Sequence, residues 1–299
     1  MGIVYNIWDH EIAHCSNLKE AGLRCGVRDS SIAINYEQNI TWTKKQDSAD
    51  VTFFTDRCLV ENIIDRVDSN IKVGWLIEPR AYHPNDYKNV ELLENKLNFI
   101  FTHDDYLLRK NPDKYKFLAA DWVCIEQESH RVHTKTNLLS MIYSNKGELD
   151  RTLRGQVATK YKEKINLFGT GTSSGQLNLK SFSLNPYCFS IAMENSIATN
   201  YYTEKIIDCF ITGNVPIYRG CNNIGEFFDE RGIITFNEIE ELDNIIDKLT
   251  FSKYMDMLPH INKNFEIAKK YINPDNLLNK FIVALRSDPS YNTKDYFIC

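Results

Sequence analysis

Short apolar segments alternate along the chain with longer stretches in which apolar residues recur at helical spacing. In the first half, four segments are typical of β-strands: residues 2–8, 49–56, 72–78 and 97–103. In the second half, five more follow at 137–145, 164–171, 187–194, 214–220 and 232–236. Nearly continuous apolar strands that alternate with helices are typical of parallel sheets covered by helices on both faces. The pattern therefore predicts an α/β protein.

The helical pattern and one polar segment predict how the chain is divided. Helical spacing is clearest at 57–67, 85–97, 151–164 and 203–212, and successive helices are predicted from about 238 onward, the last after Pro274. The polar segment 124–136 lacks periodicity and is predicted to be a linker. We expect two doubly wound, Rossmann-like domains, residues 1–130 and residues 131–299, facing a cleft. The last helix is a candidate to pack back on the first domain.

Composition narrows the class of protein. The 299 residues are 43% hydrophobic, which supplies two packed cores, and the net charge of −5 argues against a nucleic-acid partner. No apolar run approaches the roughly 18 residues that span a bilayer, and the N-terminus does not resemble a secretory signal. The eight cysteines form no CxxC pair. We therefore expect a cytoplasmic protein with free thiols and no stable membrane insertion.

Charged residues gather where the predicted strand 187–194 leads into the predicted helix 203–212. Glu204 and Lys205 fall in the first helical turn. Unpaired N–H groups and a partial positive charge make a helix start suitable for an anion, and Lys205 would add a full charge for a phosphate. The carboxylate of Glu204 would instead accept hydrogen bonds from sugar or ribose hydroxyls. However, an acidic first turn capped by Thr203 is also an ordinary helix start, so both interpretations stay open.

The longer stretch ENSIATNYYTEKIIDCFITGNVPIYRG, residues 194–220, resembles a known donor-binding signature. It is similar to the ENS…Y-x-TEK…G-x-x-P-[IV] pattern of the α1,3-fucosyltransferase family (glycosyltransferase family 10), and the resemblance covers mainly residues 140–240. It implies the two-domain GT-B fold and transfer of L-fucose from GDP-fucose with inversion. Glu204 then resembles the carboxylate that binds the donor's hydroxyls, and Lys205 the lysine on the diphosphate. Tyr201 and Asn195 would line the same pocket.

The resemblance extends upstream to two further features. MIYSNKGELDR, residues 141–151, matches the family's strand followed by an arginine, which places Arg151 against the phosphates, with Arg154 one helical turn further on as the rival candidate. A guanidinium can engage two phosphate oxygens at once, although a solvated helix face would also explain both arginines. Gly169 lies where the family has a glycine-containing turn. It would let the backbone approach the ligand or simply form the turn.

Inverting transfer requires a general base that deprotonates the acceptor hydroxyl. Glu78 ends the strongly apolar segment VGWLIE, where a carboxylate is costly unless it has a role or a partner. Family members carry their catalytic glutamate at a comparable place, but here Pro79 and Arg80 follow, and Arg80 offers an ordinary ion pair. We predict Glu78 as the base. The competing bases are Asp104 and Asp105 in FTHDDYLL, with His103 beside them as a second choice that would more often be structural or contact the acceptor.

No metal site is apparent in the sequence. It has no Asp-x-Asp pair, and its histidines lack ligand spacing, so we expect metal-independent transfer in which positive side chains neutralise the leaving group. We expect no cofactor other than the nucleotide-sugar donor, and an oligosaccharide or glycoprotein glycan as the acceptor. One alternative keeps the scaffold but uses another donor, such as UDP-xylose. Another, from a different class, is a glycan-binding protein without catalysis.

Overall fold

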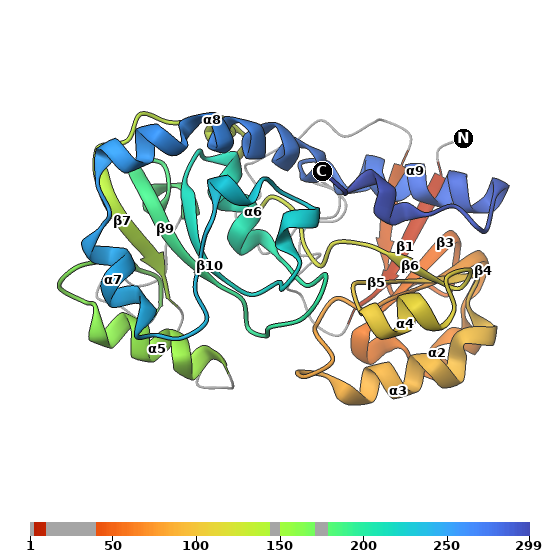
Figure 1. Cartoon of the computed structure of the whole chain (residues 1–299). Helices are drawn as coiled ribbons and strands as arrows, with labels where there is room; N and C mark the ends of the chain where they lie inside the picture. The colour runs from red at the N-terminus through yellow and green to blue at the C-terminus, as the bar shows by residue number, and fades with distance from the viewer. Residues whose placement is uncertain (1–2, 10–39, 144–149, 171–178) are drawn as a thin grey trace. The chain divides into compact units, whose positions relative to one another are not determined.

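Two parallel β-sheets organise the chain, one in each of two units (Figure 1). The computed structural model describes residues 3–9, 40–143, 150–170 and 179–299, with backbone alone at 41 and 150–152. The first unit contains the described residues of Met1–Trp122, Ala198–Tyr201 and Asn273–Ile298. The second contains those of Val123–Ile197 and Tyr202–Ile272, together with Cys299. The main chain therefore passes between the units more than once, including within the segment that carries the signature.

The sheet of the first unit has six strands in the order β2-β1-β3-β4-β5-β6. They are β1 (Ile3–Trp8), β2 (Ile40–Lys44), β3 (Ser48–Thr55), β4 (Asp68–Trp75), β5 (Phe99–Thr102) and β6 (Tyr115–Phe117). Every pair in this sheet is parallel. The strand pattern predicted β1, β3, β4 and β5. It missed β2 and β6, because their sequences ITWTK and YKF place polar residues between apolar ones and contain no continuous apolar run.

Adjacent residues of these strands point to opposite faces of the sheet, so each face has its own core. Phe54 lies in a cluster with residues of α2 (Glu61–Arg66), α3 (Pro84–Leu93) and α4 (Asp105–Lys110). Phe53 points the other way and packs against the rings of Tyr5, Trp42 and Trp75. The helix α9 (Pro274–Ser287) belongs to this unit, and the Trp42 indole donates a hydrogen bond to Asp275 at its start, with an N–O distance of 3.0 Å.

The sheet of the second unit has five strands in the order β11-β10-β9-β7-β8, all parallel. They are β7 (Asn137–Ile142), β8 (Asn166–Phe168), β9 (Tyr187–Met193), β10 (Val215–Arg219) and β11 (Ile234–Thr235). From β7 the chain passes through α5 (Asp150–Lys160) to β8, and β9 then pairs with the other side of β7. Ligands of doubly wound sheets bind at the carboxyl ends of strands where the order reverses. In this sheet that point lies between β7 and β9.

Helices supply the rest of the second core. They are α5, α6 (Glu204–Ile211), α7 (Glu241–Asp247) and α8 (Phe251–Ala268). All seven residues of β9 are buried, and Tyr254 of α8 packs on Phe189, with ring centroids 6.2 Å apart. The predicted apolar face of α6, which includes Ile207 and Phe210, is fully buried. Burial of each such side chain stabilises the fold by about 1.5–3 kcal/mol, so this core fixes where α6 begins.

Short 3-10 turns complete the described chain. They are η1 (Asp56–Cys58), η2 (Glu94–Lys96), η3 (Gln127–Ser129), η4 (Lys180–Ser183), η5 (Ile224–Glu226), η6 (Glu230–Gly232), η7 (Lys269–Tyr271) and η8 (Thr293–Tyr296). The six cysteines that the structure describes have free thiols, and five of them are buried. Among the described helices, none is long and apolar enough to cross a membrane. Two all-parallel sheets with helices confirm the predicted α/β class.

Candidate functional site

A pocket of about 250 Å³ lies in the second unit at the point where the strand order reverses. The ends of β7 and β9 form its apolar wall, through residues such as Met141 and Met193. Its polar lining combines three cations with two carboxylates: Arg154, Lys180, Lys205, Glu204 and Asp208. A small pocket with an apolar wall and convergent charges is typical of a site for a charged small molecule.

A buried carboxylate ties the end of β9 to the start of α6. Glu194, directly after β9, is 0% exposed. Its Oε1 accepts a hydrogen bond from the Thr203 backbone N–H at 2.9 Å, and its Oε2 accepts one from the Thr203 hydroxyl at 2.7 Å. A Cβ on Gly220 would overlap the Cγ of Glu194, so glycine leaves room for this side chain. Because both contacts go to the residue that caps α6, the helix start cannot move independently of the sheet.

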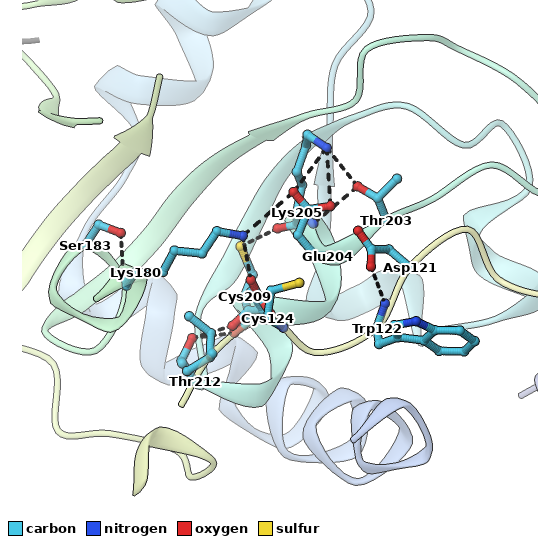
Figure 2. A network of polar contacts seen from close by, with 12 residues as sticks. Asp121, Trp122, Cys124, Lys180, Ser183, Thr203, Glu204, Lys205, Cys209 and Thr212 are labelled. Atoms are coloured by element: carbon cyan, nitrogen blue, oxygen red, sulfur yellow. Dashed lines mark hydrogen bonds and ion pairs between the residues drawn. The ribbon is translucent and has the colours of Figure 1, made fainter. Parts of the chain in front are cut away.

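The ammonium of Lys205 lies beside oxygen atoms of Thr203 and Glu204, as the dashed lines in Figure 2 mark. Its Nζ donates to the Thr203 hydroxyl at 3.0 Å and lies 3.4 Å from Glu194 Oε2 and 3.3 Å from Glu204 Oε1. Burial alone would lower the pKa of Lys205, but the carboxylates of Glu204 and Glu194 outweigh it, so the pKa is raised. The side chain is therefore charged, and it remains 25% exposed toward the pocket.

A second ion pair, between Lys180 and Asp208, lies in the same lining. Lys180 Nζ, on η4, lies 3.1 Å from Asp208 Oδ2 and 3.7 Å from Glu204 Oε1. Asp208 is 2% exposed, and its other oxygen accepts a hydrogen bond from the Cys124 backbone N–H at 2.7 Å. Burial raises the pKa of Asp208 to about 7, against the opposing effect of Lys180. Neither residue was predicted from the sequence, although the carboxylate of Asp208 inside the apolar run IIDCFI was a usable signal.

Three other residues predicted to bind the donor lie at different positions in the second unit. Arg154, on α5, is buried and lines the pocket with Lys205 and Glu204. Arg151 lies in the first turn of α5, but its side chain is outside the described residues. Asn195 is half-buried and follows Glu194 after the end of β9. The structure thus brings Arg154, the rival candidate, together with the two signature residues.

Tyr201 belongs to the first unit in the division of the chain. It is buried, and its ring centroid lies 4.7 Å from that of His103. The signature is therefore divided: Tyr201 packs with the first unit, whereas Glu204 and Lys205 line the pocket of the second.

Gly169 follows β8 with φ at +105°, a backbone conformation that side-chain-bearing residues rarely adopt. A Cβ there would also overlap the carbonyl oxygen of Tyr143. The backbone conformation at position 169 and the close approach of Tyr143 therefore both require glycine there.

In the first unit, Glu78 is half-buried and lies three residues beyond the end of β4. Asp56 Oδ1 accepts hydrogen bonds from the N–H groups of Ile77, at 2.8 Å, and Glu78, at 3.3 Å. The Glu78 carbonyl accepts another from the Tyr87 hydroxyl at 2.8 Å. Asp56 itself has a left-handed backbone, with φ at +38°. The backbone of Glu78 is thus held on both sides at the carboxyl edge of the sheet.

The segment His103–Asp105, which supplied the alternative candidates, follows the end of β5. His103 is 2% exposed, and burial lowers its pKa to about 4, so the imidazole is neutral near pH 7. Its Nε2 lies 3.4 Å from the Tyr87 hydroxyl, and its Nδ1 has no hydrogen-bond partner within the described structure. Asp105 forms an ion pair with Arg109 one helical turn away on α4. Such partly exposed pairs add little stability.

Arg80 forms an ion pair through two nitrogen atoms with the Asp104 carboxylate, with both N–O distances at 2.9 Å. From the sequence, Arg80 was a candidate ion-pair partner for Glu78, whereas the contacts above are with Asp104. Asp104 also caps α4 by accepting a hydrogen bond from the Leu107 N–H at 3.0 Å. Across the described ranges, no three His, Cys, Asp or Glu side chains form a group that could hold a metal ion.

Comparison with known proteins gives a family for this part of the chain. Residues 132–266 match the family model described as "Glycosyltransferase family 10 (fucosyltransferase) C-term". The alpha-(1,3)-fucosyltransferase FucT of Helicobacter pylori is 25% identical over 182 residues, which cover 55% of this chain. The match spans 37% of the length of that relative, well under half.

Solved structures share the fold at low identity. A crystal structure of alpha1,3-fucosyltransferase with GDP has a TM-score of 0.56 at 15% identity, covering 98% of this chain and 92% of its own. Anabaena Alr3699/HepE in complex with UDP-glucose has a TM-score of 0.55 at 13% identity, covering 80% and 79%. These likenesses establish the GT-B type of fold. The pocket lies inside residues 132–266, the part of the chain that matches the family model of glycosyltransferase family 10.

Proposed function

We propose that the protein transfers a sugar, most simply L-fucose from GDP-fucose, to a hydroxyl of a glycan, with inversion and without a metal ion. One observation carries the proposal: Arg154, Glu204 and Lys205 line a single pocket at the carboxyl ends of β7 and β9. This is the place where doubly wound sheets bind nucleotides, and the pocket lies in the part of the chain that matches the family model.

On the donor side, two cations bind the diphosphate. The Arg154 guanidinium engages two phosphate oxygens, and the Lys205 ammonium adds a point charge beside the start of α6. Glu204, whose Oε1 lies 3.3 Å from Lys205 Nζ, accepts hydrogen bonds from hydroxyls of the nucleotide or sugar. Because Glu194 already orients Lys205, little side-chain freedom is lost when the donor binds.

On the acceptor side, Glu78 is the general base. It takes the proton of the acceptor hydroxyl while the oxygen attacks the anomeric carbon from the face opposite the diphosphate. The bond between that carbon and the diphosphate oxygen breaks, and its electron pair leaves with the nucleotide diphosphate. The contacts of Asp56 and Tyr87 to the Glu78 backbone support this role, because a base must be held in position. Lys205 and Arg154 would neutralise the leaving charge in place of a metal.

The test is calorimetry of the whole chain with GDP, UDP, GDP-fucose and UDP-glucose, followed by a transfer assay read by mass spectrometry. We expect GDP and GDP-fucose to bind, and Lys205→Met to weaken binding about 10-fold or more, the equivalent of one charge-assisted hydrogen bond. Lys162→Met, at an exposed position, is the matched control. Preference for UDP would replace the fucosyl donor with another such as UDP-xylose. Glycan binding without any nucleotide binding would overturn the proposal in favour of a non-catalytic protein.

A further inference from the structure

The pocket contains one ion pair that the transfer mechanism does not use. Lys180 reaches the lining from η4, a separate segment from α6, and Figure 2 shows its side chain directed toward Glu204. Its Nζ lies 3.1 Å from Asp208 Oδ2, the shorter of its two ion-pair contacts. Both Lys180 and Asp208 line the pocket with Lys205. Any anion that occupies this space therefore meets the Lys180–Asp208 pair.

The two partners differ in how far they are buried. The Asp208 side chain is 3% exposed, whereas the Lys180 side chain is 34% exposed. Isolated burial of a carboxylate costs several kcal/mol, and here the Cys124 N–H and Lys180 offset that cost. Asp208 is thus fixed in the wall by α6, while Lys180 is the partner with the greater exposed surface. A stability role alone would not require the cation to lie in the pocket lining.

We propose that Lys180 is a further donor-binding residue, a third cation that the buried Asp208 holds in the pocket until the donor's phosphates take over as its partner. This inference rests on the proposed function, since it concerns the same nucleotide-sugar site. On donor binding, Lys180 exchanges one anionic partner, the Asp208 carboxylate, for another, the diphosphate.

This change of partner for Lys180 also changes the protonation of Asp208. When Lys180 turns to the diphosphate, Asp208 loses its main cationic partner and gains negative charge nearby. The groups that act on it are Lys180 on η4, Glu204 on α6 and the Cys124 N–H, while Lys205 and Arg154 line the same pocket. Burial already raises the pKa of Asp208 to about 7, so the donor raises it further. At pH 8 the carboxylate then takes up a proton as the donor binds, and affinity falls as pH rises above 7.

The experiment is calorimetry of the whole chain with GDP-fucose at pH 8, in two buffers with different ionisation enthalpies. GDP-fucose is the probe because its diphosphate, substituted at both ends, has no proton that titrates near this pH. We expect the parent to take up a substantial fraction of one proton, and Asp208→Asn to take up almost none. Lys180→Met should weaken binding about 10-fold or more, whereas Lys180→Arg should restore most of it.

Three outcomes separate this inference from the function on which it rests. Binding by Lys180→Met equal to that of the parent, while Lys205→Met is weakened, would overturn the inference and leave the proposed function standing. Proton uptake that persists in Asp208→Asn would also overturn it. If the parent binds no nucleotide or nucleotide sugar, both fail. Lys162→Met is the control for removal of a positive charge, and circular dichroism of each variant checks that it folds.

Discussion

The ammonium of Lys205 lies 3.4 Å from the carboxylate of Glu194, a residue with no exposed surface. The cation that we assign to the diphosphate is therefore oriented before any ligand arrives. Glu194 also holds Thr203 through two hydrogen bonds, so one buried carboxylate fixes both the helix start and the lysine on it. The proposed phosphate site therefore depends on the junction between β9 and α6 as well as on Lys205.

Glu194→Gln should therefore lower both stability and donor affinity. The amide keeps the size of the side chain but loses the charge that faces Lys205 and one of the two oxygens that accept from Thr203. Removal of one partner from a buried charged network costs about 3 kcal/mol in the free energy of unfolding, which urea denaturation measures. Glu163→Gln, at an exposed position, is the control. A midpoint equal to that of the parent would contradict the assigned role of Glu194.

Glu78→Gln should reduce turnover about 100-fold or more and leave the affinity for GDP-fucose nearly unchanged, because the amide cannot accept the acceptor's proton. Single-turnover transfer and calorimetry measure the two quantities. Asp105→Asn is the comparison, since Asp105 is one of the alternatives in the segment His103–Asp105 and pairs with Arg109 on its own helix. Full turnover in Glu78→Gln together with loss of turnover in Asp105→Asn would assign the base to the segment His103–Asp105.

Excess EDTA should leave the transfer rate unchanged. The positive charge that faces the leaving group is expected to come from Arg154 and Lys205, both in the pocket lining. The measurement is the initial rate with and without chelator, then after addition of Mg²⁺ or Mn²⁺. Loss of activity that either ion restores would show that the cationic side chains are not sufficient.

His103 should make the protein less stable as pH falls. Burial lowers its pKa from 6.5 to about 4, so between these values the unfolded chain binds a proton that the folded protein does not. The contribution of His103 to the free energy of unfolding is then fully present above pH 6.5 and declines toward pH 4, by about 2 kcal/mol between pH 7 and pH 5. His103→Phe removes this contribution, so its free energy of unfolding should change less over that range. Parallel pH profiles for the two proteins would refute the assignment.

Alanine substitutions at two glycines near Tyr143 should have different effects on stability. At Gly169 the new Cβ meets the Tyr143 carbonyl oxygen, and φ is +105°, so Gly169→Ala should destabilise by about 2 kcal/mol or more. At Gly155, inside α5, the nearest atom is the Tyr143 hydroxyl at 2.9 Å, the far end of a flexible side chain. Gly155→Ala should therefore be neutral or stabilise by up to about 1 kcal/mol. Thermal melts of both variants measure the contrast, and equal effects would contradict it.

The fold was largely predictable from the sequence because buried parallel strands have a distinctive composition. The segment YCFSIAM is almost wholly apolar, and helices with a clear apolar face lie between such strands. The strands that were missed have the opposite property. β2 is an edge strand with polar residues between apolar ones, and β6 has three residues, too few for any periodicity.

The site was only partly predictable, for a different physical reason. Glu204 and Lys205 are adjacent in the sequence, so their signature is local. Lys180 and Asp208 meet only because η4 and α6 are brought together by the sheet, and no spacing rule links residues on such separate segments. The position of Tyr201 against His103 likewise depends on contacts between distant parts of the chain. Pairs of this kind require three-dimensional structure.

The contacts between Glu194 and Thr203 fasten both ends of the segment that joins β9 to α6. With those ends secured, loop-closure entropy changes little with loop length, and insertions or exchanges within the segment need not displace the lysine that follows it. Residues 196–199, which are half-buried or exposed, are therefore a natural location for diversification. Libraries confined to these positions leave Tyr201, Thr203 and Lys205 in place.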